Sequence, residues 1–469
     1  MNSLEVFAEM KPITLQFNHN SSTPLYIQLY RYLKDEINCG NMNAGEKLPS
    51  LRRLSRDLSI SITTTELAYN QLLVEGYVTS KPQSGYYVAS IAGHFSDEKA
   101  HTNISYDFTA YTFEDSAYKY DLSCFDFNKW KKCMSRVLNE YSHLLLFESD
   151  PQGEAALRFE VSKYVYTSRG VIAAPDQIVI GAGTQQLTSH LCRIMRKMNI
   201  GHVATEDPGY LPVQNIFRDH GMSITKIPVV SDGIMIEKLP TNIPAAVYVS
   251  PSNQFPTGSV MPIGKRYRLL EWADENDSFI LEDDYDSELR YFGKPVPALQ
   301  GLDKNARVVY LGSFSSTLFP AIKISYMVLP KEMVEIFDAI KSDYTQTCSK
   351  TEQLTLALFM EEGLYYTNIK KLRNLYSQKL QTALAAFAKF GSGFTTPTNT
   401  NSGINIILKV RTRKDPGQLS AMAKTIGLNV LPAASLTDQD TAALIFYYNQ
   451  IPLDELESSI EEMIRLWSA

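Results

Sequence analysis

Residues 308–320 read Val308-Val309-Tyr310-Leu311-Gly312-Ser313-Phe314-Ser315-Ser316-Thr317-Leu318-Phe319-Pro320, a short apolar run followed by a turn rich in hydroxyl side chains. An apolar run of this length suits a strand that is buried on both faces of a parallel sheet. Similar runs occur at residues 177–180, 245–249 and 279–281, and helical patterns separate them. The alternation predicts an α/β body built on a parallel sheet.

The size and composition of the chain narrow its class. It has 469 residues, enough for two or three domains, with 44% hydrophobic and 20% charged residues, as in ordinary globular proteins. We expect no membrane helix, because no apolar run approaches the roughly 18 residues that one needs. The first residues lack a basic start followed by an apolar stretch, so we predict a cytoplasmic protein without a signal peptide. The five cysteines include no Cys-x-x-Cys pair, which argues against disulfides and a metal site.

Residues 20–90 have the pattern of a small helical module that ends in a hairpin. Helices are predicted near residues 24–39, 50–58 and 61–75, and only two residues separate the second helix from the third. Such a tight joint is typical of a helix-turn-helix. Two short β-rich runs then flank the turn Lys81-Pro82-Gln83-Ser84-Gly85, which predicts a hairpin, or wing.

This module resembles the winged helix of the GntR family. The matching phrases are Pro24-Leu25-Tyr26-Ile27-Gln28-Leu29, Lys47-Leu48-Pro49-Ser50-Leu51-Arg52, Ala68-Tyr69-Asn70-Gln71-Leu72 and Glu75-Gly76-Tyr77. The resemblance implies that the third helix enters the major groove of an operator in double-stranded DNA. It assigns DNA contacts to Arg52, Arg53 and Arg56 at phosphates, to Ser61, Thr63, Thr64 and Thr65 near base edges, and to Gly85 in the wing.

The charge of this module leaves an alternative open. Residues 1–90 contain eight basic and eight acidic side chains, and Ile62 stands where relatives often carry a basic residue. The module could therefore bind a protein instead of DNA. The basic cluster at residues 52–56 favours DNA, with an affinity that depends on dimerisation.

The rest of the chain is predicted to form a linker and a large body. Residues 91–115 are polar and irregular, as in a linker. The body is expected to cover residues 116–469, with a large subdomain at about 150–330 and a small C-terminal α+β subdomain at about 331–469.

Five phrases of the body resemble fold-type I aminotransferases, which use pyridoxal 5'-phosphate (PLP). They occur in the family's order, as Asp150-Pro151-Gln152-Gly153, Gly181-Ala182-Gly183-Thr184-Gln185-Gln186, Glu206-Asp207-Pro208-Gly209-Tyr210, Ser250-Pro251-Ser252-Asn253-Gln254-Phe255-Pro256-Thr257-Gly258 and Glu282-Asp283-Asp284-Tyr285-Asp286-Ser287-Glu288-Leu289-Arg290-Tyr291. The resemblance implies a homodimer with a PLP site. It assigns the phosphate to Gly183, Thr184, Gln185 and Lys323, the ring face to Tyr210, the ring nitrogen to Asp283 and the ring hydroxyl to Tyr285.

A GntR-like head on an aminotransferase-like body resembles the MocR-type regulators. Four positions depart from the pattern of the aminotransferase family. Ser316 stands at the position of the lysine that binds PLP covalently, and Lys323 replaces a phosphate-binding arginine. Ile445 replaces the arginine for the substrate carboxylate, and Glu148 replaces a tyrosine that reaches the partner subunit's phosphate. No catalytic residue is therefore predicted, because a serine hydroxyl cannot form an imine.

Several interpretations of the body remain open. It could bind no ligand or a different one, hold PLP non-covalently, carry an engineered serine, or use Lys323 as a displaced covalent lysine. The leading function is a transcriptional regulator that senses PLP or an amino-acid-like compound. The alternatives are a PLP-dependent aminotransferase with an accessory DNA-binding domain and an architectural dimer without a ligand.

Overall fold

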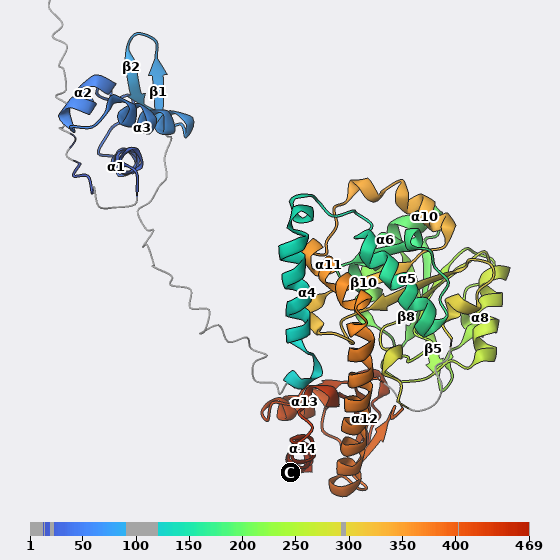
Figure 1. Ribbon diagram of the computed structural model, residues 1–469. Helices are drawn as coiled ribbons and strands as arrows, with labels where there is room; N and C mark the ends of the chain where they lie inside the picture. Colours follow the sequence, from blue (N-terminus) through green and yellow to red (C-terminus); the bar gives the residue numbers. More distant parts are fainter. Residues whose placement is uncertain are drawn as a thin grey trace, which may run out of the picture. The chain divides into compact units, whose positions relative to one another are not determined.

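The computed structural model forms two compact units, residues 1–111 and 112–469 (Figure 1). The structure describes residues 13, 15–18, 23–90, 121–291, 297–401 and 403–468. The predicted linker at 91–115 and the first residues of the predicted body therefore lie outside the described residues.

The N-terminal unit contains the predicted helices and hairpin. Its elements are α1 (Leu25–Asn38), α2 (Leu51–Asp57), α3 (Ile62–Val74), β1 (Val78–Lys81) and β2 (Gly85–Val88). The hydroxyls of Ser50 and Ser61 cap α2 and α3, since each accepts a backbone N–H three residues further on. The apolar stripe of α1 packs with α3 and the hairpin in one core, which includes Leu29, Leu33, Leu54, Ala68, Tyr69, Leu72, Val78 and Val88.

The body is built on a mixed eight-stranded sheet. The strand order is β3-β10-β9-β8-β7-β4-β5-β6. The strands are β3 (Ile178–Gly181), β4 (His202–Asp207), β5 (Ser223–Val230), β6 (Gly233–Ile234), β7 (Ala246–Val249), β8 (Phe279–Asp284), β9 (Val308–Ser313) and β10 (Ser325–Val328). All four strands predicted from apolar runs are present.

The sheet is not wholly parallel, which corrects the prediction. Strands β5, β4, β7, β8 and β9 pair in parallel, but β10 is antiparallel to both β9 and β3. The physical reason is the short connection between β9 and β10, which contains only residues 314–324 and a 3-10 turn. A connection of this kind lacks the crossover helix that parallel pairing usually needs, so the chain turns straight back.

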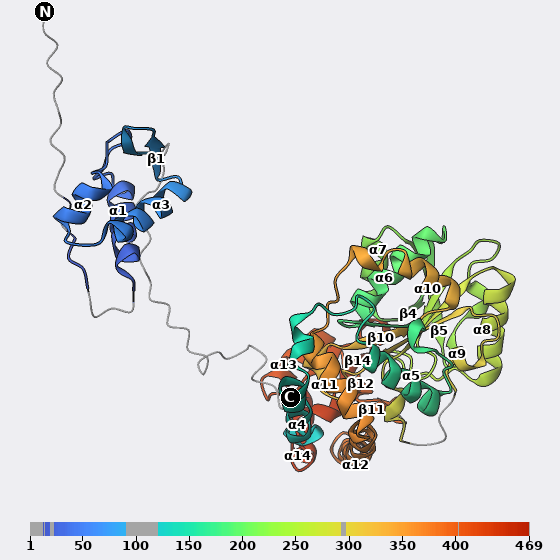
Figure 2. The same ribbon diagram turned by 45° about the horizontal axis from the view of Figure 1, so that its top comes forward.

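Helices cover both faces of this sheet. They are α4 (Phe127–Glu140), α5 (Ala155–Arg169), α6 (Thr184–Lys197), α7 (Leu211–Asp219), α8 (Ile263–Glu275), α10 (Lys331–Asp338) and α11 (Lys350–Glu361). One core contains α6, α7 and α10, and a core on the opposite face contains α4, α5 and α11 (Figure 2). Along β3, Ile178 and Ile180 face the second core, while Val179 faces the first. Burial on both faces explains the continuous apolar runs of the sequence.

A smaller α+β unit forms the C-terminal end of the body. Its elements are α12 (Leu364–Phe390), β11 (Thr395–Thr398), β12 (Ile406–Arg411), α13 (Pro416–Lys424), β13 (Val430–Pro432), β14 (Thr441–Phe446) and α14 (Leu456–Ser468). The four strands form an antiparallel sheet in the order β11-β12-β14-β13. In Figures 1 and 2, α12, α13 and α14 lie together at one end of the body, away from α6 and α8.

Packing places the start of the small unit later than the residue 331 that we expected. Met333 and Phe337 of α10 share a core with the large sheet, and so does Phe359 of α11. The first turns of α12 still pack in that core, through Tyr365 and Ile369, and the apolar face of the helix joins the core of the small sheet only from Leu372 onward. By this packing, the small unit begins within α12, near Leu372. Among the described residues, no helix is long and apolar enough to cross a membrane.

Candidate functional site

A cavity of about 490 Å³ lies at the carboxyl ends of β8 and β9. Ligands of α/β proteins commonly bind at this edge of the sheet. All seven residues predicted to bind a cofactor line the cavity, together with Ser316. They are Gly183, Thr184, Gln185, Tyr210, Asp283, Tyr285 and Lys323. The fold thus gathers residues that lie up to 140 positions apart in the sequence.

One end of the cavity is suited to an anion. Gly183 precedes α6 with a φ of +90°, which glycine adopts without strain. The first backbone N–H groups of α6 lack helical acceptors, and the helix dipole favours negative charge there. Lys323 adds a positive charge, and it is the one lysine or arginine among the described residues that line the cavity. A phosphate group fits this end.

The other chemical feature is a buried carboxyl group. Asp283, near the end of β8, is 6% exposed and accepts a hydrogen bond from the hydroxyl of Tyr248. Burial raises the pKa of Asp283 to about 7, and the nearby Asp284 carboxylate adds to the rise. A protonated nitrogen of a bound ring would compensate the desolvated charge. The hydroxyl of Tyr285 lies close by and donates to the carbonyl oxygen of Asn253 at 3.0 Å.

Replacing Asp283 by asparagine is expected to stabilise the protein without ligand, and more at pH 8 than at pH 5. The folded pKa lies above its ordinary value, so ionisation costs stability as pH rises towards about 7. Asparagine removes this cost, which is on the order of 4 kcal/mol at pH 8, and can still accept from Tyr248. Urea unfolding at both pH values measures the effect.

The matched control for that experiment is Asp219→Asn, which changes an exposed carboxylate on α7. It should not reproduce the pH-dependent gain. An equal gain for Asp283→Asn at pH 5 and pH 8 would show that its carboxyl is not held near neutrality.

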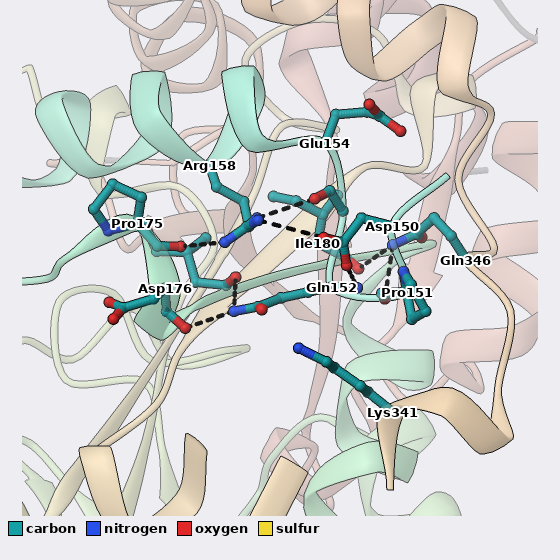
Figure 3. Close-up of polar contacts among 12 residues, drawn as sticks. Asp150, Pro151, Gln152, Glu154, Arg158, Pro175, Asp176, Ile180, Lys341 and Gln346 are labelled. Carbon is teal, nitrogen blue, oxygen red and sulfur yellow. Dashed lines mark hydrogen bonds and ion pairs between the residues drawn. The ribbon is translucent and has the colours of Figure 1, made fainter. Parts of the chain in front are cut away.

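The turn at residues 150–153 supports the anion-binding end (Figure 3). The backbone N–H of Ile180 donates to the carbonyl of Gln152 at 2.9 Å, so the turn extends the edge of the sheet at β3. Gln346 clamps the arrangement, because its Nε2 donates to the carbonyls of Pro151 and Ile180, each at 3.1 Å. A Cβ at Gly153 would lie 2.5 Å from Ile180. The turn thereby holds the strand that leads into Gly183.

Two further contacts anchor this turn. Arg158 of α5 donates to the carbonyls of Gly153 and Pro175, at 3.0 and 2.9 Å (Figure 3). The amide of Gln152 reaches the carbonyls of Asp176 and Ile178. Sequence patterns identified the turn but not these partners, which come from separate segments.

A buried ionic network lies at the carboxyl end of β8, next to the cavity. Arg169 donates from Nε to Asp284 and from Nη2 to Ser252, both at 2.7 Å, and Tyr310 donates to the same Asp284 oxygen. The neighbouring Glu282 accepts from two backbone N–H groups at the start of α9 (Leu299–Leu302). These bonds fix the strand end that carries Asp283, since a buried charge needs compensating partners.

Several cavity residues were not predicted. They are Ala182, Ser250, Phe255, Ser313, Ser315, Ser325, Ile404, Asn405 and Tyr447. Ile404 and Asn405 belong to the small unit and have no local motif, so only the folded chain reveals them. Of the four departures, Ser316 and Lys323 line the cavity. Ile445 is buried in an apolar cluster that includes Ile407, whereas Glu148 is exposed and lies outside the cavity lining.

In the N-terminal unit, most predicted DNA contacts are accessible. Arg52, Arg53 and Arg56 of α2 are exposed, as are Ser61 and Thr63 at the start of α3. Arg53 lies 3.6 Å from Asp57 in an exposed ion pair. Gly85 has a φ of +114°, which allows the tight tip of the wing.

The prediction that Thr65 contacts DNA is wrong. Its side chain is fully buried, and its hydroxyl donates to the carbonyl of Ser61 at 3.4 Å. It therefore cannot reach a base edge. Thr64 is partly buried, and its hydroxyl bonds that of Ser61 at 2.8 Å. Helical geometry is the reason, because successive residues of α3 point in different directions and Thr65 lies on the buried side of the helix, with Ala68, Tyr69 and Leu72.

The described residues include no group of three or more His, Cys, Asp or Glu side chains that could hold a metal ion.

The two units and the cavity together define a class of protein: a winged-helix DNA-binding unit joined to a PLP-dependent transferase fold.

Comparisons with known proteins agree with this class. Residues 25–88 match the model of bacterial regulatory proteins of the gntR family, and residues 113–438 match aminotransferase class I and II. The chain is 40% identical to the uncharacterized HTH-type transcriptional regulator YdeL of Bacillus subtilis, covering 90% of this chain and 92% of YdeL. It is 31% identical to the probable rhizopine catabolism regulatory protein MocR of Rhizobium meliloti, covering 89% and 88%.

The fold of the body also matches solved aminotransferases. Pyrococcus horikoshii kynurenine aminotransferase, solved in complex with PMP, has a TM-score of 0.63 and 24% identity, covering 74% of this chain and 89% of the enzyme. The chain belongs to the MocR-type transcriptional regulators, in which a GntR winged helix precedes an aminotransferase-like body.

Proposed function

We propose that this protein is a DNA-binding transcriptional regulator whose body binds a small effector without forming a covalent bond to it. One observation carries the proposal. Ser316 lines the cavity in which the fold gathers all seven predicted cofactor residues. The cavity therefore contains residues that could hold a phosphorylated ring. Ser316, however, stands at the position that the resemblance assigns to the covalent lysine.

The cavity fits PLP as such an effector. Lys323 and the first turn of α6 would hold its phosphate, Asp283 its ring nitrogen, Tyr285 its ring hydroxyl and Tyr210 one ring face. When bound, PLP supplies a reactive aldehyde and an electron-withdrawing ring. The hydroxyl of Ser316 cannot form an imine with it, so no Schiff base would form at this position. An amino-acid-like compound is the other candidate effector.

A working aminotransferase is not favoured. The relatives that align over nearly the whole chain are named as regulators, not as enzymes. Ile445 also presents an apolar side chain within a buried cluster, where the resemblance predicts a carboxylate-binding arginine. A bound α-carboxylate would lack that partner.

We further propose that the body forms a homodimer. Large apolar side chains of the body are exposed in the single chain, including Leu122, Leu146 and Phe147, with exposed fractions of 74%, 85% and 69%. Exposed apolar side chains of this size suit a subunit interface. A dimer would also present two N-terminal units to one operator, which would compensate for the near-zero net charge of each unit.

The DNA-binding proposal is tested by comparing two changes in the head. Arg52→Ala should weaken binding to specific and unrelated DNA alike and reduce the salt slope by about one unit, because a phosphate contact carries no sequence information. Thr63→Ala should instead relax sequence preference by about 1 kcal/mol at one position, because it removes a single hydrogen bond to a base edge. Fluorescence anisotropy of a promoter fragment and a shuffled fragment, at several salt concentrations, measures both.

Both side chains are exposed, so folding should survive either change. Arg411→Ala, an exposed change in the small unit, is the control for loss of charge alone. If the unchanged protein binds no fragment near its own gene at low salt, the regulator proposal fails.

A further inference from the structure

The start of α3 carries an exposed apolar side chain that the proposed DNA contacts do not use. Ile62 is the first residue of the helix and is 47% exposed. It is absent from the apolar core of its unit, whose nearest members in sequence are Ile60, Leu58 and Ala68. Folding of the head therefore does not account for an isoleucine at this position.

The polar groups around Ile62 are largely engaged within the chain. The Oγ of Ser61 accepts the backbone N–H of Thr64 at 3.0 Å and bonds the Thr64 hydroxyl at 2.8 Å. Thr65 is buried. Within the described part of this turn, Thr63 is the hydroxyl that makes no hydrogen bond to the chain. Fewer hydroxyl groups of this turn are therefore free to hydrogen-bond to base edges. The exposed surface of the turn is also more apolar than its sequence suggests.

The position of Ile62 at the start of α3 indicates what this surface contacts. In a winged helix, the first turn of the recognition helix faces base edges in the major groove. Arg52, Arg53 and Arg56 are exposed on α2, which packs on α3, and they suit phosphates on either side of such a groove. The only apolar group that the bases display in the major groove is the C5-methyl of thymine.

We infer that Ile62 contacts the C5-methyl group of a thymine in the operator, and that this contact sets part of the sequence preference. The inference rests on the proposed DNA binding. Burying one methyl against Ile62 corresponds to about fourfold in affinity for one head. With two heads bound to one operator, the expected factor is about 15-fold.

The test uses the full chain and two versions of one promoter fragment, made with thymine or with uracil, which lacks the methyl group. The unchanged protein should bind the uracil fragment about 15-fold more weakly by fluorescence anisotropy. Ile62→Ala should bind the thymine fragment more weakly and should barely distinguish the two fragments. Val74→Ala is the matched control, since Val74 is 83% exposed at the far end of the same helix and should keep the full ratio.

The outcomes separate this inference from the proposed function. Equal binding of both fragments by the unchanged protein overturns the thymine contact but leaves DNA binding intact. A ratio that persists in Ile62→Ala also overturns it, because the methyl effect would then arise elsewhere. Failure to bind either fragment, or any promoter fragment near the gene, refutes the proposed function and with it the contact.

Discussion

A polypeptide of residues 1–95 is expected to bind a promoter fragment at least about 100-fold more weakly than the full chain. The N-terminal unit has its own apolar core, so it should fold alone. Its eight basic and eight acidic side chains within residues 1–90 provide little net attraction to phosphates. The full chain would instead place two heads on one operator through the dimeric body, so the second head would bind at a high effective concentration.

An electrophoretic shift with both proteins at the same salt concentration measures the difference. A fusion of residues 1–95 to a dimeric coiled coil is the control, and it should recover a large part of the affinity. If the head alone binds as tightly as the full chain, the body is not the dimerisation unit that we propose.

The second large effect concerns covalent chemistry. After incubation with PLP and reduction with borohydride, the unchanged protein should carry no pyridoxyl group, whereas Ser316→Lys should carry one at position 316. The hydroxyl of Ser316 cannot form a reducible imine, while a lysine amine at the same place in the cavity can. Mass spectrometry of proteolytic peptides detects the group, and absorbance of the unreduced protein reports its formation.

We expect only partial labelling of Ser316→Lys. Lys323 offers one compact charge where an arginine would bind the phosphate with a two-pronged fork. The double change Ser316→Lys with Lys323→Arg should therefore be labelled more completely. A reduced group on Lys323 of the unchanged protein would contradict our proposal and would identify Lys323 as a displaced covalent lysine.

Short-range patterns explain why the head could be predicted so closely. Ser50 and Ser61 cap helices by accepting N–H groups three residues away, and Gly85 supplies the positive φ that the wing requires. Apolar residues recur every four positions in α1 and form the buried face of that helix. Each of these signals acts within a few residues, so the sequence contains them directly.

The sequence also predicted four strands of the large sheet and the seven cofactor residues that line the cavity, from Gly183 to Lys323. These residues stand in recognisable turns beside apolar runs, and parallel strands bring their carboxyl ends to one edge. Their contacts could not be predicted, since partners such as Gln346 and Pro151 are far apart along the chain. The same is true of Asn405, which the small unit contributes to the cavity.

By itself, the sequence determined the helices and hairpin of the N-terminal unit, four strands of the large sheet, the family and the absence of a lysine at position 316. Local periodicity, caps, turn residues and motifs specify these features. Only the tertiary structure decided that Thr65 is buried, that β10 runs antiparallel and that α10 and α11 belong to the large sheet. It also decided the raised pKa of Asp283. Burial, strand direction and desolvation arise from contacts between distant segments, and those contacts exist only once the chain has folded.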